Sequence, residues 1–161
     1  MIKEKRKSDK MILGWQEWCA LPELGLPALK IKLDTGAKTS ALHAFDIETF
    51  EQGGIKYVRF TVHPLQFKQR YEKVCVAELI DERRVTSSSG HREKRYVIIT
   101  PVVIGDKRWD IEVTLTKRDE LAYRMLLGRQ AMVGKVVVDP AKSFRKGKVT
   151  KKEARLLYKQ K

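Results

Sequence analysis

"KLDTGAKTSALHAF", residues 32–45, is the stretch of this 161-residue chain that decides its fold. Apolar residues alternate with lysines over residues 29–33, and this period of two predicts a half-buried strand that ends at Asp34. Thr35 and Gly36 follow, and residues of these types favour a sharp turn. The sequence therefore places a carboxylate at the end of a strand, on a turn rich in hydrogen-bonding groups.

The rest of the chain predicts many short strands and little helix. Glycine-containing turns separate alternating apolar runs, which is typical of hairpins and of a closed or sandwich-like β domain. We expect hairpin turns near Gly53-Gly54 and Gly105-Asp106, a polar tip at residues 87–90, one short helix from Arg129 to Gly134, and a strand in "KVVVD" after it.

The net charge of +14 is concentrated at the two ends of the chain. Residues 1–10 carry a net charge of +3, and residues 140–161 carry +8. Basic tails are usually solvated, so this distribution weakens the case for a nucleic-acid-binding core, although a polyanionic partner is an alternative explanation. We also expect the tryptophans to pack in the core or at a dimer contact, since the aromatics do not alternate with basic residues on one strand face.

Cys19 and Cys75 stand far apart in the sequence and form no CxxC pair, so a disulfide or a thiolate metal site is not predicted. The apolar run near the N-terminus is too short for a signal peptide, and no run approaches membrane-spanning length. We expect a cytoplasmic protein with reduced thiols, no membrane association and no cofactor.

Two motifs carry a resemblance to a known group of enzymes. Asp34-Thr35-Gly36-Ala37 resembles the active-site signature of the pepsin-like aspartic peptidases in its retroviral form. "LLGR", residues 126–129, resembles the segment that begins the C-terminal helix of retropepsins. An Asx-type turn without catalysis is the alternative explanation of the bare tripeptide, and the second motif is what argues against it.

A longer resemblance extends over residues 12–144. "GWQEWCALPELGLPALKIKLDTGAKTSALHAFDIE", "RFTVHPLQ" and "LLGRQAM" with "VDPAKS" are similar to a bacterial family of retropepsin-like proteins once described as ATP-dependent zinc proteases. Members of that family often accompany an ATP-grasp ligase that adds glutamates to a ribosomal protein. The resemblance implies an all-β, retropepsin-like closed barrel with one short C-terminal helix at residues 11–144. We expect a basic extension at residues 1–10 and a basic, disordered tail at residues 145–161.

The resemblance also implies a mechanism. Two carboxylates held about 3 Å apart share one proton and together activate a water for peptide hydrolysis. The chain contains one such signature, so the second carboxylate must come from a second copy of Asp34 in a homodimer. Asp34, Thr35 and Gly36 are thus the predicted catalytic residues. "KVVVD" and the N-terminal strand are candidates for an intersubunit sheet.

A flap that covers the bound peptide is the next expectation. The arms around the polar tip are the candidate, and their arginines and lysines predict a preference for an acidic or glutamate-extended peptide. The predicted substrate-binding residues are Ala37, Lys38, Ser88, Ser89, Gly90 and Arg92, and the predicted structural supports are Gly128 and Arg129.

The chain departs from the retroviral pattern at Lys38, where those enzymes usually have an acidic residue that pairs with the helix arginine. The partner of Arg129 is therefore open, with Asp46 and Glu48 as candidates. Thr39 and Ser40 supply further polar groups nearby, for which turn hydrogen bonding is the simpler role.

Two other functions are weighed against an aspartic peptidase. The first is a non-catalytic dimeric module that binds an acidic or ribosomal partner, or a ligase. The second is a zinc protease, although the three histidines, His43, His63 and His91, lie in separate segments without metal-ligand spacing. Neither the substrate nor the need for a partner protein is decided by the sequence.

Overall fold

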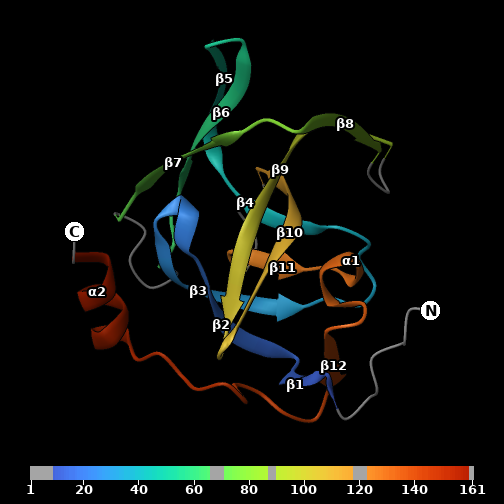
Figure 1. The fold of residues 1–161 in the computed structure, drawn as a ribbon, viewed down its shortest axis with the longest axis vertical. Coiled ribbons are helices and arrows are strands. Elements are labelled where there is room, and N and C mark those ends of the chain that lie inside the picture. Colours follow the sequence, from blue (N-terminus) through green and yellow to red (C-terminus); the bar gives the residue numbers. More distant parts are fainter. Residues whose placement is uncertain (1–8, 66–70, 87–89, 118–122, 160–161) are drawn as a thin grey trace.

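The protein is described here from a computed structural model, which covers residues 9–65, 71–86, 90–117 and 123–159. Most of these residues lie in strands (Figure 1). The elements are β1 (Met11–Gly14), β2 (Gln16–Leu21), a 3₁₀ turn (Pro22–Leu24), β3 (Leu26–Leu33), β4 (Ser40–His43), β5 (Phe45–Gln52), β6 (Ile55–Val62), β7 (Lys73–Glu78), β8 (Asp81–Thr86), β9 (Arg92–Ile104), β10 (Lys107–Thr116), β11 (Met125–Leu127), α1 (Arg129–Met132), β12 (Val136–Asp139) and α2 (Lys151–Lys159).

The central sheet closes on itself. Its strands follow the order β10-β4-β11-β3-β2-β9, and β9 pairs in turn with β10. Closure leaves no exposed sheet edge in this part of the molecule and fills the interior with side chains. The prediction of an all-β closed barrel is confirmed, and α1 is the short helix that the sequence predicts, whereas α2 is a second helix that it does not predict.

One strand of the barrel comes from late in the chain. β11 lies between β3 and β4, parallel to β3 and antiparallel to β4. The connection from β3 to β4 therefore has to pass over the end of β11, and that connection contains the Asp34 turn. This topology brings both sequence motifs to one end of the barrel.

Hairpins extend from the barrel where the glycine turns predict them. β5 and β6 pair around Gly53 and Gly54, which both have the positive φ that a tight hairpin turn requires. These two strands project at the top of Figure 1, with β7 pairing along β6. β9 and β10 pair around Gly105, as expected.

The first and last strands, β1 and β12, pair with each other inside one subunit. β1 runs parallel to β12, with Met11 opposite Val136 and Gly14 opposite Asp139. The segment after β12 then runs along the bottom edge of Figure 1 to α2. We call residues 140–150, which connect β12 to α2, the strap.

The structure differs from the expectation of disorder over residues 145–159. The strap is held because the buried Glu17 carboxylate accepts hydrogen bonds from the N–H groups of Arg145 (2.9 Å) and Lys146 (3.1 Å). α2 begins at a capping box in which Thr150 and Glu153 exchange side-chain-to-backbone hydrogen bonds. The sequence suggested too few apolar residues for docking, but hydrogen bonding supplements them.

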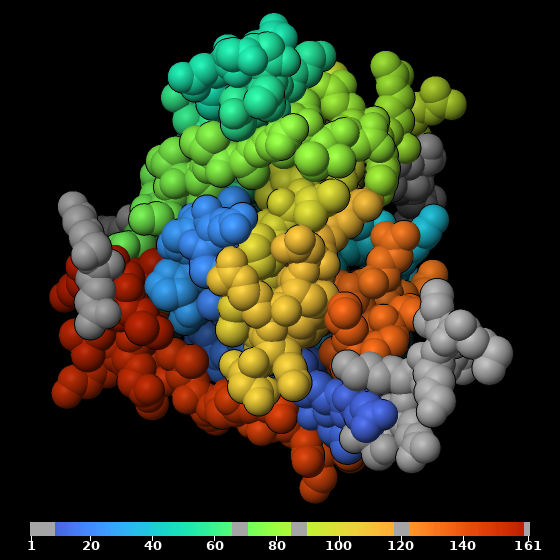
Figure 2. All heavy atoms as spheres, viewed as in Figure 1, coloured from blue at the N-terminus to red at the C-terminus, as the bar shows by residue number. Residues whose placement is uncertain are grey.

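Tyr158 is the residue that docks α2. Its hydroxyl donates to the carbonyl of Ala28 and accepts from the N–H of the same residue (3.4 Å). Ala28 lies where the β2–β3 register shifts, so its backbone groups need a partner other than the regular ladder. Tyr158 is 7% exposed, and Ala154 beside it is fully buried. Figure 2 shows the strap and α2 following the lower and left margins of the barrel.

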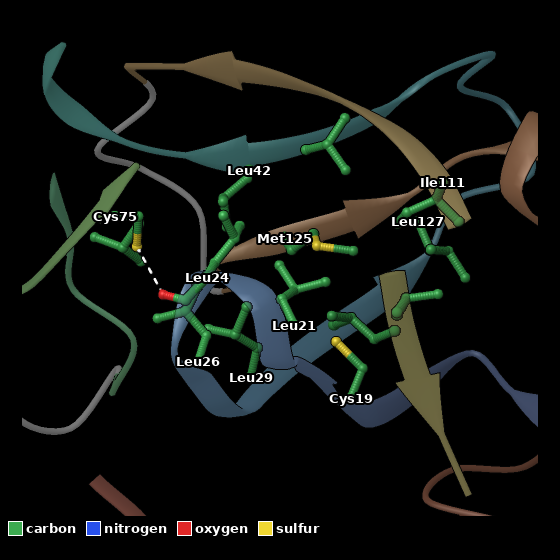
Figure 3. Packing of buried hydrophobic residues seen from close by; sticks show 14 of the residues in the cluster. Cys19, Leu21, Leu24, Leu26, Leu29, Leu42, Cys75, Ile111, Met125 and Leu127 are labelled. Carbon is green, nitrogen blue, oxygen red and sulfur yellow. Dashed lines mark hydrogen bonds between the residues drawn. The ribbon is translucent and has the colours of Figure 1, made fainter. Parts of the chain in front are cut away.

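The barrel interior is aliphatic, with leucines from β2, β3, β4 and β11 meeting near Met125 (Figure 3). Trp18 and Trp109 pack against this core in part, whereas Trp15 remains 37% exposed. Both cysteines are buried and free, as the spacing predicts. None of the described helices is long and apolar enough to cross a membrane.

Candidate active site

Asp34 stands at the end of β3, on a turn held by backbone hydrogen bonds. Its N–H donates to the carbonyl of Leu127 (2.8 Å), which continues the parallel pairing of β3 with β11. Its carboxylate accepts the N–H of Gly36 at Oδ1 (3.0 Å), and its carbonyl accepts the N–H of Ala37 (3.3 Å). The carboxylate is half-buried and is oriented by the turn itself.

Arg129 locks this turn from the start of α1. Its Nη1 donates to the carbonyls of Thr35 and Gly36, both at 3.0 Å, and its N–H donates to the carbonyl of Ala37 at 2.8 Å. One guanidinium nitrogen can hold two adjacent carbonyls because Nη1 carries two N–H groups in a rigid plane. This answers the question that Lys38 raised, since the partner of Arg129 is backbone and no acidic residue is needed at that position.

The two acidic candidates for that role are placed elsewhere. Glu48 forms an ion pair with Arg59 across β5 and β6, and Asp46 is exposed at a positive φ of 50°. The sequence could not show this, because a backbone acceptor leaves no signature in side-chain identity.

Gly128 is required by close packing of the backbone. A Cβ at this position would lie 2.6 Å from the carbonyl carbon of Thr39, so no larger residue fits without moving the turn. The N–H of Gly128 donates to Oγ of Ser40 (3.0 Å), and the N–H of Gln130 donates to the carbonyl of Lys38 (3.0 Å). Residues 128–130 thus hold both sides of a loop that lies about ninety positions earlier in the chain.

The predicted substrate-binding positions on this loop remain predictions. Ala37 is half-buried, and the side chain of Lys38 is exposed beside it. A Cβ at Gly36 would lie 3.3 Å from Oδ1 of Asp34, a tight contact, so a larger residue there would shift the carboxylate by a few tenths of an ångström. Thr35 is exposed, so its hydroxyl remains available for the predicted contact with a second loop.

The candidate flap is a hairpin of β8 and β9, in which Thr86 lies opposite Arg92. Gly90 is exposed at a φ of 81°, a conformation that suits glycine, and Arg92 is exposed as well. Ser88 and Ser89 lie outside the described residues. The hairpin is therefore confirmed as a structure, while its role over a bound peptide remains a prediction.

The basic charge of this hairpin is partly used within the protein. Ion pairs join Arg83 to Asp81 and Glu112, Lys94 to Glu82, and Arg95 to Glu93. The hydrogen bond to Glu112 raises the pKa of Arg83 above its ordinary value. Cations that are already paired attract a distant carboxylate less than free cations do. The hairpin should therefore attract an acidic peptide less strongly than its number of arginines and lysines suggests.

Two contributions to the site were not predicted in the roles that they have. The carbonyl of Trp15 accepts the N–H of Leu33 (2.9 Å) just before the turn, and a backbone carbonyl leaves no signal in the sequence. The hydroxyl of Ser40, which was expected to bond within its own turn, accepts the N–H of Gly128 instead. Within the described ranges, no group of three or more His, Cys, Asp or Glu side chains lies close enough to hold a metal ion. His63 contacts Glu72 (3.3 Å), and His43 is buried in β4.

A family comparison agrees with this architecture. The model of the RimB-like family, described as the retropepsin-like aspartic endopeptidase RimB, matches residues 12–149 of the chain. A crystal structure of a Legionella pneumophila protein of unknown function superposes with a TM-score of 0.73 and 35% identity, covering 84% of this chain and 98% of that one.

Curated relatives are longer proteins. A probable alpha-L-glutamate ligase of Desulfotalea psychrophila is 46% identical over 149 residues, which is 92% of this chain and 32% of the relative. A protein of the same name from Shewanella pealeana is 45% identical over 150 residues, covering 93% of this chain and 33% of the relative. The chain spans about a third of the length of these relatives.

Proposed function

Because this chain belongs to the RimB-like family of retropepsin-like aspartic endopeptidases, we propose that it hydrolyses peptide bonds with two Asp34 carboxylates, one from each of two subunits. The main support for the proposal is that the Asp34 turn is held in one conformation by contacts within the subunit. Arg129, Gly128 and the backbone of Leu127 fix the loop, so the carboxylate is presented in one orientation without help from a substrate.

The chemistry follows from the sharing of one proton. The ionised carboxylate takes a proton from water, whose oxygen attacks the peptide carbonyl carbon while the protonated carboxyl donates to the carbonyl oxygen. Breakdown of the tetrahedral intermediate returns a proton to the leaving nitrogen as the C–N bond breaks. The two groups titrate as a unit, so the pH profile belongs to the pair.

A second subunit is needed because the chain has one Asp-Thr-Gly sequence. The β1–β12 pair joins both ends of the domain and is our candidate surface for contact between subunits, with a two-fold axis between the Asp34 turns. Under this proposal Thr35 of each loop donates to the other loop, and Ala37, Lys38 and the β8–β9 hairpin contact the bound peptide.

For the substrate, we propose a protein tail that ends in glutamates. The support is the name of the longer relatives, which are probable alpha-L-glutamate ligases, together with the net charge of +14 of this chain. A peptidase of this kind would remove glutamates that a ligase had added, on a ribosomal or other protein.

Subunit mixing tests the shared pair directly. Wild-type protein and Asp34→Asn are unfolded together, refolded in equal amounts, and assayed on a peptide ending in glutamates by mass spectrometry. A pair built from two chains needs wild-type residues in both, so about a quarter of the activity should remain, whereas independent sites would retain about half.

The homogeneous variant separates catalysis from binding. Asp34→Asn should lower turnover by at least about 10²-fold, while sedimentation shows an unchanged dimer. Undiminished hydrolysis by Asp34→Asn, or hydrolysis that stops on chelation and returns with zinc, would refute the mechanism. Tight binding of the peptide without turnover in either protein would favour the binding-module alternative.

A further inference from the structure

A pocket of about 230 Å³ lies between the strap and the outer face of β2 and β3, away from the Asp34 turn. We call it the aromatic-basic pocket. Its lining combines rings, aliphatic side chains and lysines: Trp18, Lys30, Pro64, Phe144, Lys148, Val149 and Lys151. No described acidic residue lines it, so its field favours an anion.

Phe144 is the most informative residue of the pocket. Its φ is 52°, in the left-handed region that costs a bulky residue roughly 1–2 kcal/mol. The backbone is nevertheless held there, since the N–H of Phe144 donates to the carbonyl of Gln16 (2.9 Å). Glycine or asparagine would adopt this conformation with less strain, so the ring lines the pocket at a local backbone cost, and such strained residues are enriched at binding sites.

Two lysines flank that ring. The Nζ of Lys148 lies 5.3 Å and that of Lys30 lies 5.8 Å from the ring centroid of Phe144, and Lys30 is also 5.3 Å from the ring of Tyr123. These contacts hold the ammonium groups at the rim of the pocket rather than in bulk water. An anion at the rim therefore meets two cations that are already oriented.

The strap holds the positive charges around the aromatic-basic pocket in fixed positions. Residues 140–159 contain eight basic residues and one acid, a net charge of +7, and Glu17 anchors the strap by two of its N–H groups. Charge that was expected in a solvated tail is thus arranged along one edge of the barrel. The pairing of rings with lysines, which no single strand displays, arises because Phe144 is brought beside Trp18 and Lys30.

A single-stranded nucleic acid fits these features better than an acidic peptide. Carboxylates would use the lysines but would gain little from the apolar wall of Trp18, Pro64 and Phe144. A nucleotide presents both a planar base for such a wall and a phosphate for the rim. We propose that the aromatic-basic pocket binds one nucleotide of single-stranded RNA, with the base against the rings and the phosphates at Lys30 and Lys148.

The test is fluorescence anisotropy of a labelled twelve-nucleotide oligouridylate with the full chain. Lys30→Gln/Lys148→Gln is compared with Lys56→Gln/Lys107→Gln, which removes the same charge from exposed positions elsewhere. The pocket variant should bind at least tenfold more weakly, with the slope of log affinity against log salt reduced by about 1.4 for two lost phosphate contacts. The control should change affinity less than threefold.

Phe144→Leu tests the ring with the charge kept. Loss of stacking should weaken RNA binding by about fivefold or more. Circular dichroism and limited proteolysis check that the strap of this variant is folded. If it is not, Trp18→Leu provides a second test of stacking. Hydrolysis of a glutamate-tailed peptide should be unchanged in these variants, so the outcome is independent of the proposed peptidase.

Three results would overturn the proposal: equal losses in the pocket and control variants, unchanged binding in both ring variants, or no binding at physiological salt. A twelve-residue polyglutamate peptide that competes with the RNA at equal or lower concentration, and that is insensitive to Phe144→Leu, would assign the pocket to acidic protein tails instead.

Discussion

Replacing Glu17 by glutamine should release the strap. The carboxylate is 0% exposed and accepts three N–H groups: Gly14 (2.7 Å) and Arg145 (2.9 Å) at Oε2, and Lys146 (3.1 Å) at Oε1. A glutamine keeps one acceptor oxygen and turns an NH₂ group toward at least one of these donors. Shape is preserved, so the change isolates the hydrogen bonds.

The magnitude follows from that count. A hydrogen bond to a charged group contributes about 1.5–3 kcal/mol, and at least one is lost while the others lose their charge. We expect the free energy of unfolding to fall by about 2–4 kcal/mol, which corresponds to roughly 5–15 °C in Tm for a chain of this size. Urea denaturation followed by tryptophan fluorescence measures it.

Hydrogen exchange locates the effect. The amides of Arg145 and Lys146 should exchange faster in Glu17→Gln by a larger factor than those of the barrel strands, because the strap opens locally. Glu23→Gln is the matched control, because Glu23 is exposed and forms only a long ion pair with Arg108, at 3.6 Å. This variant should change the free energy of unfolding by less than about 0.5 kcal/mol. A loss below 0.5 kcal/mol in Glu17→Gln with unchanged protection of both amides would refute this account of the strap.

Three further predictions concern the turn, α2 and a buried thiol. Gly128→Ala should destabilise the protein by about 1–3 kcal/mol and lower turnover, because its Cβ would lie 2.6 Å from Thr39; urea titration and the peptide assay check both, and full activity would contradict the close packing. Tyr158→Phe should cost about 1–2 kcal/mol by leaving the Ala28 backbone unpaired, with an unchanged urea midpoint as the contrary result. Burial raises the pKa of Cys75 to about 12, so iodoacetamide should label it slowly at pH 8. The neutral thiol is favoured in the folded state, so stability is complete below the ordinary thiol pKa and falls as the pH rises toward 12, by up to about 1.4 kcal/mol per pH unit.

Local signals in the sequence predicted the local parts of the structure. Glycines specify tight turns by their backbone freedom, and the two predicted hairpins turn at Gly53-Gly54 and at Gly105 as expected. The short helix begins at Arg129, where the motif places it, and Gly134 follows it at a φ of 78°. These features depend on a few neighbouring residues, so a short window of sequence contains the information.

Features that depend on distant backbone were not predictable. Arg129 binds carbonyls, which every residue has, so side-chain identity could not reveal its partner. The docking of α2 depends on the hydroxyl of Tyr158 and on only two buried positions, Ala154 and Tyr158, which form a narrower apolar face than sequence patterns detect. Glu17 did leave a signal, because it is a carboxylate on the same strand face as Cys19 and Leu21, and a buried charge in that position needs partners.

The position of β11 has a consequence for how the protein is made. Asp34 is synthesised more than ninety residues before Leu127, Gly128 and Arg129, on which its turn depends. Pairing between segments so far apart in sequence forms slowly, and it cannot begin before the later segment has been synthesised. A growing chain that has not yet reached Arg129 therefore carries the acidic residue without the contacts that orient it.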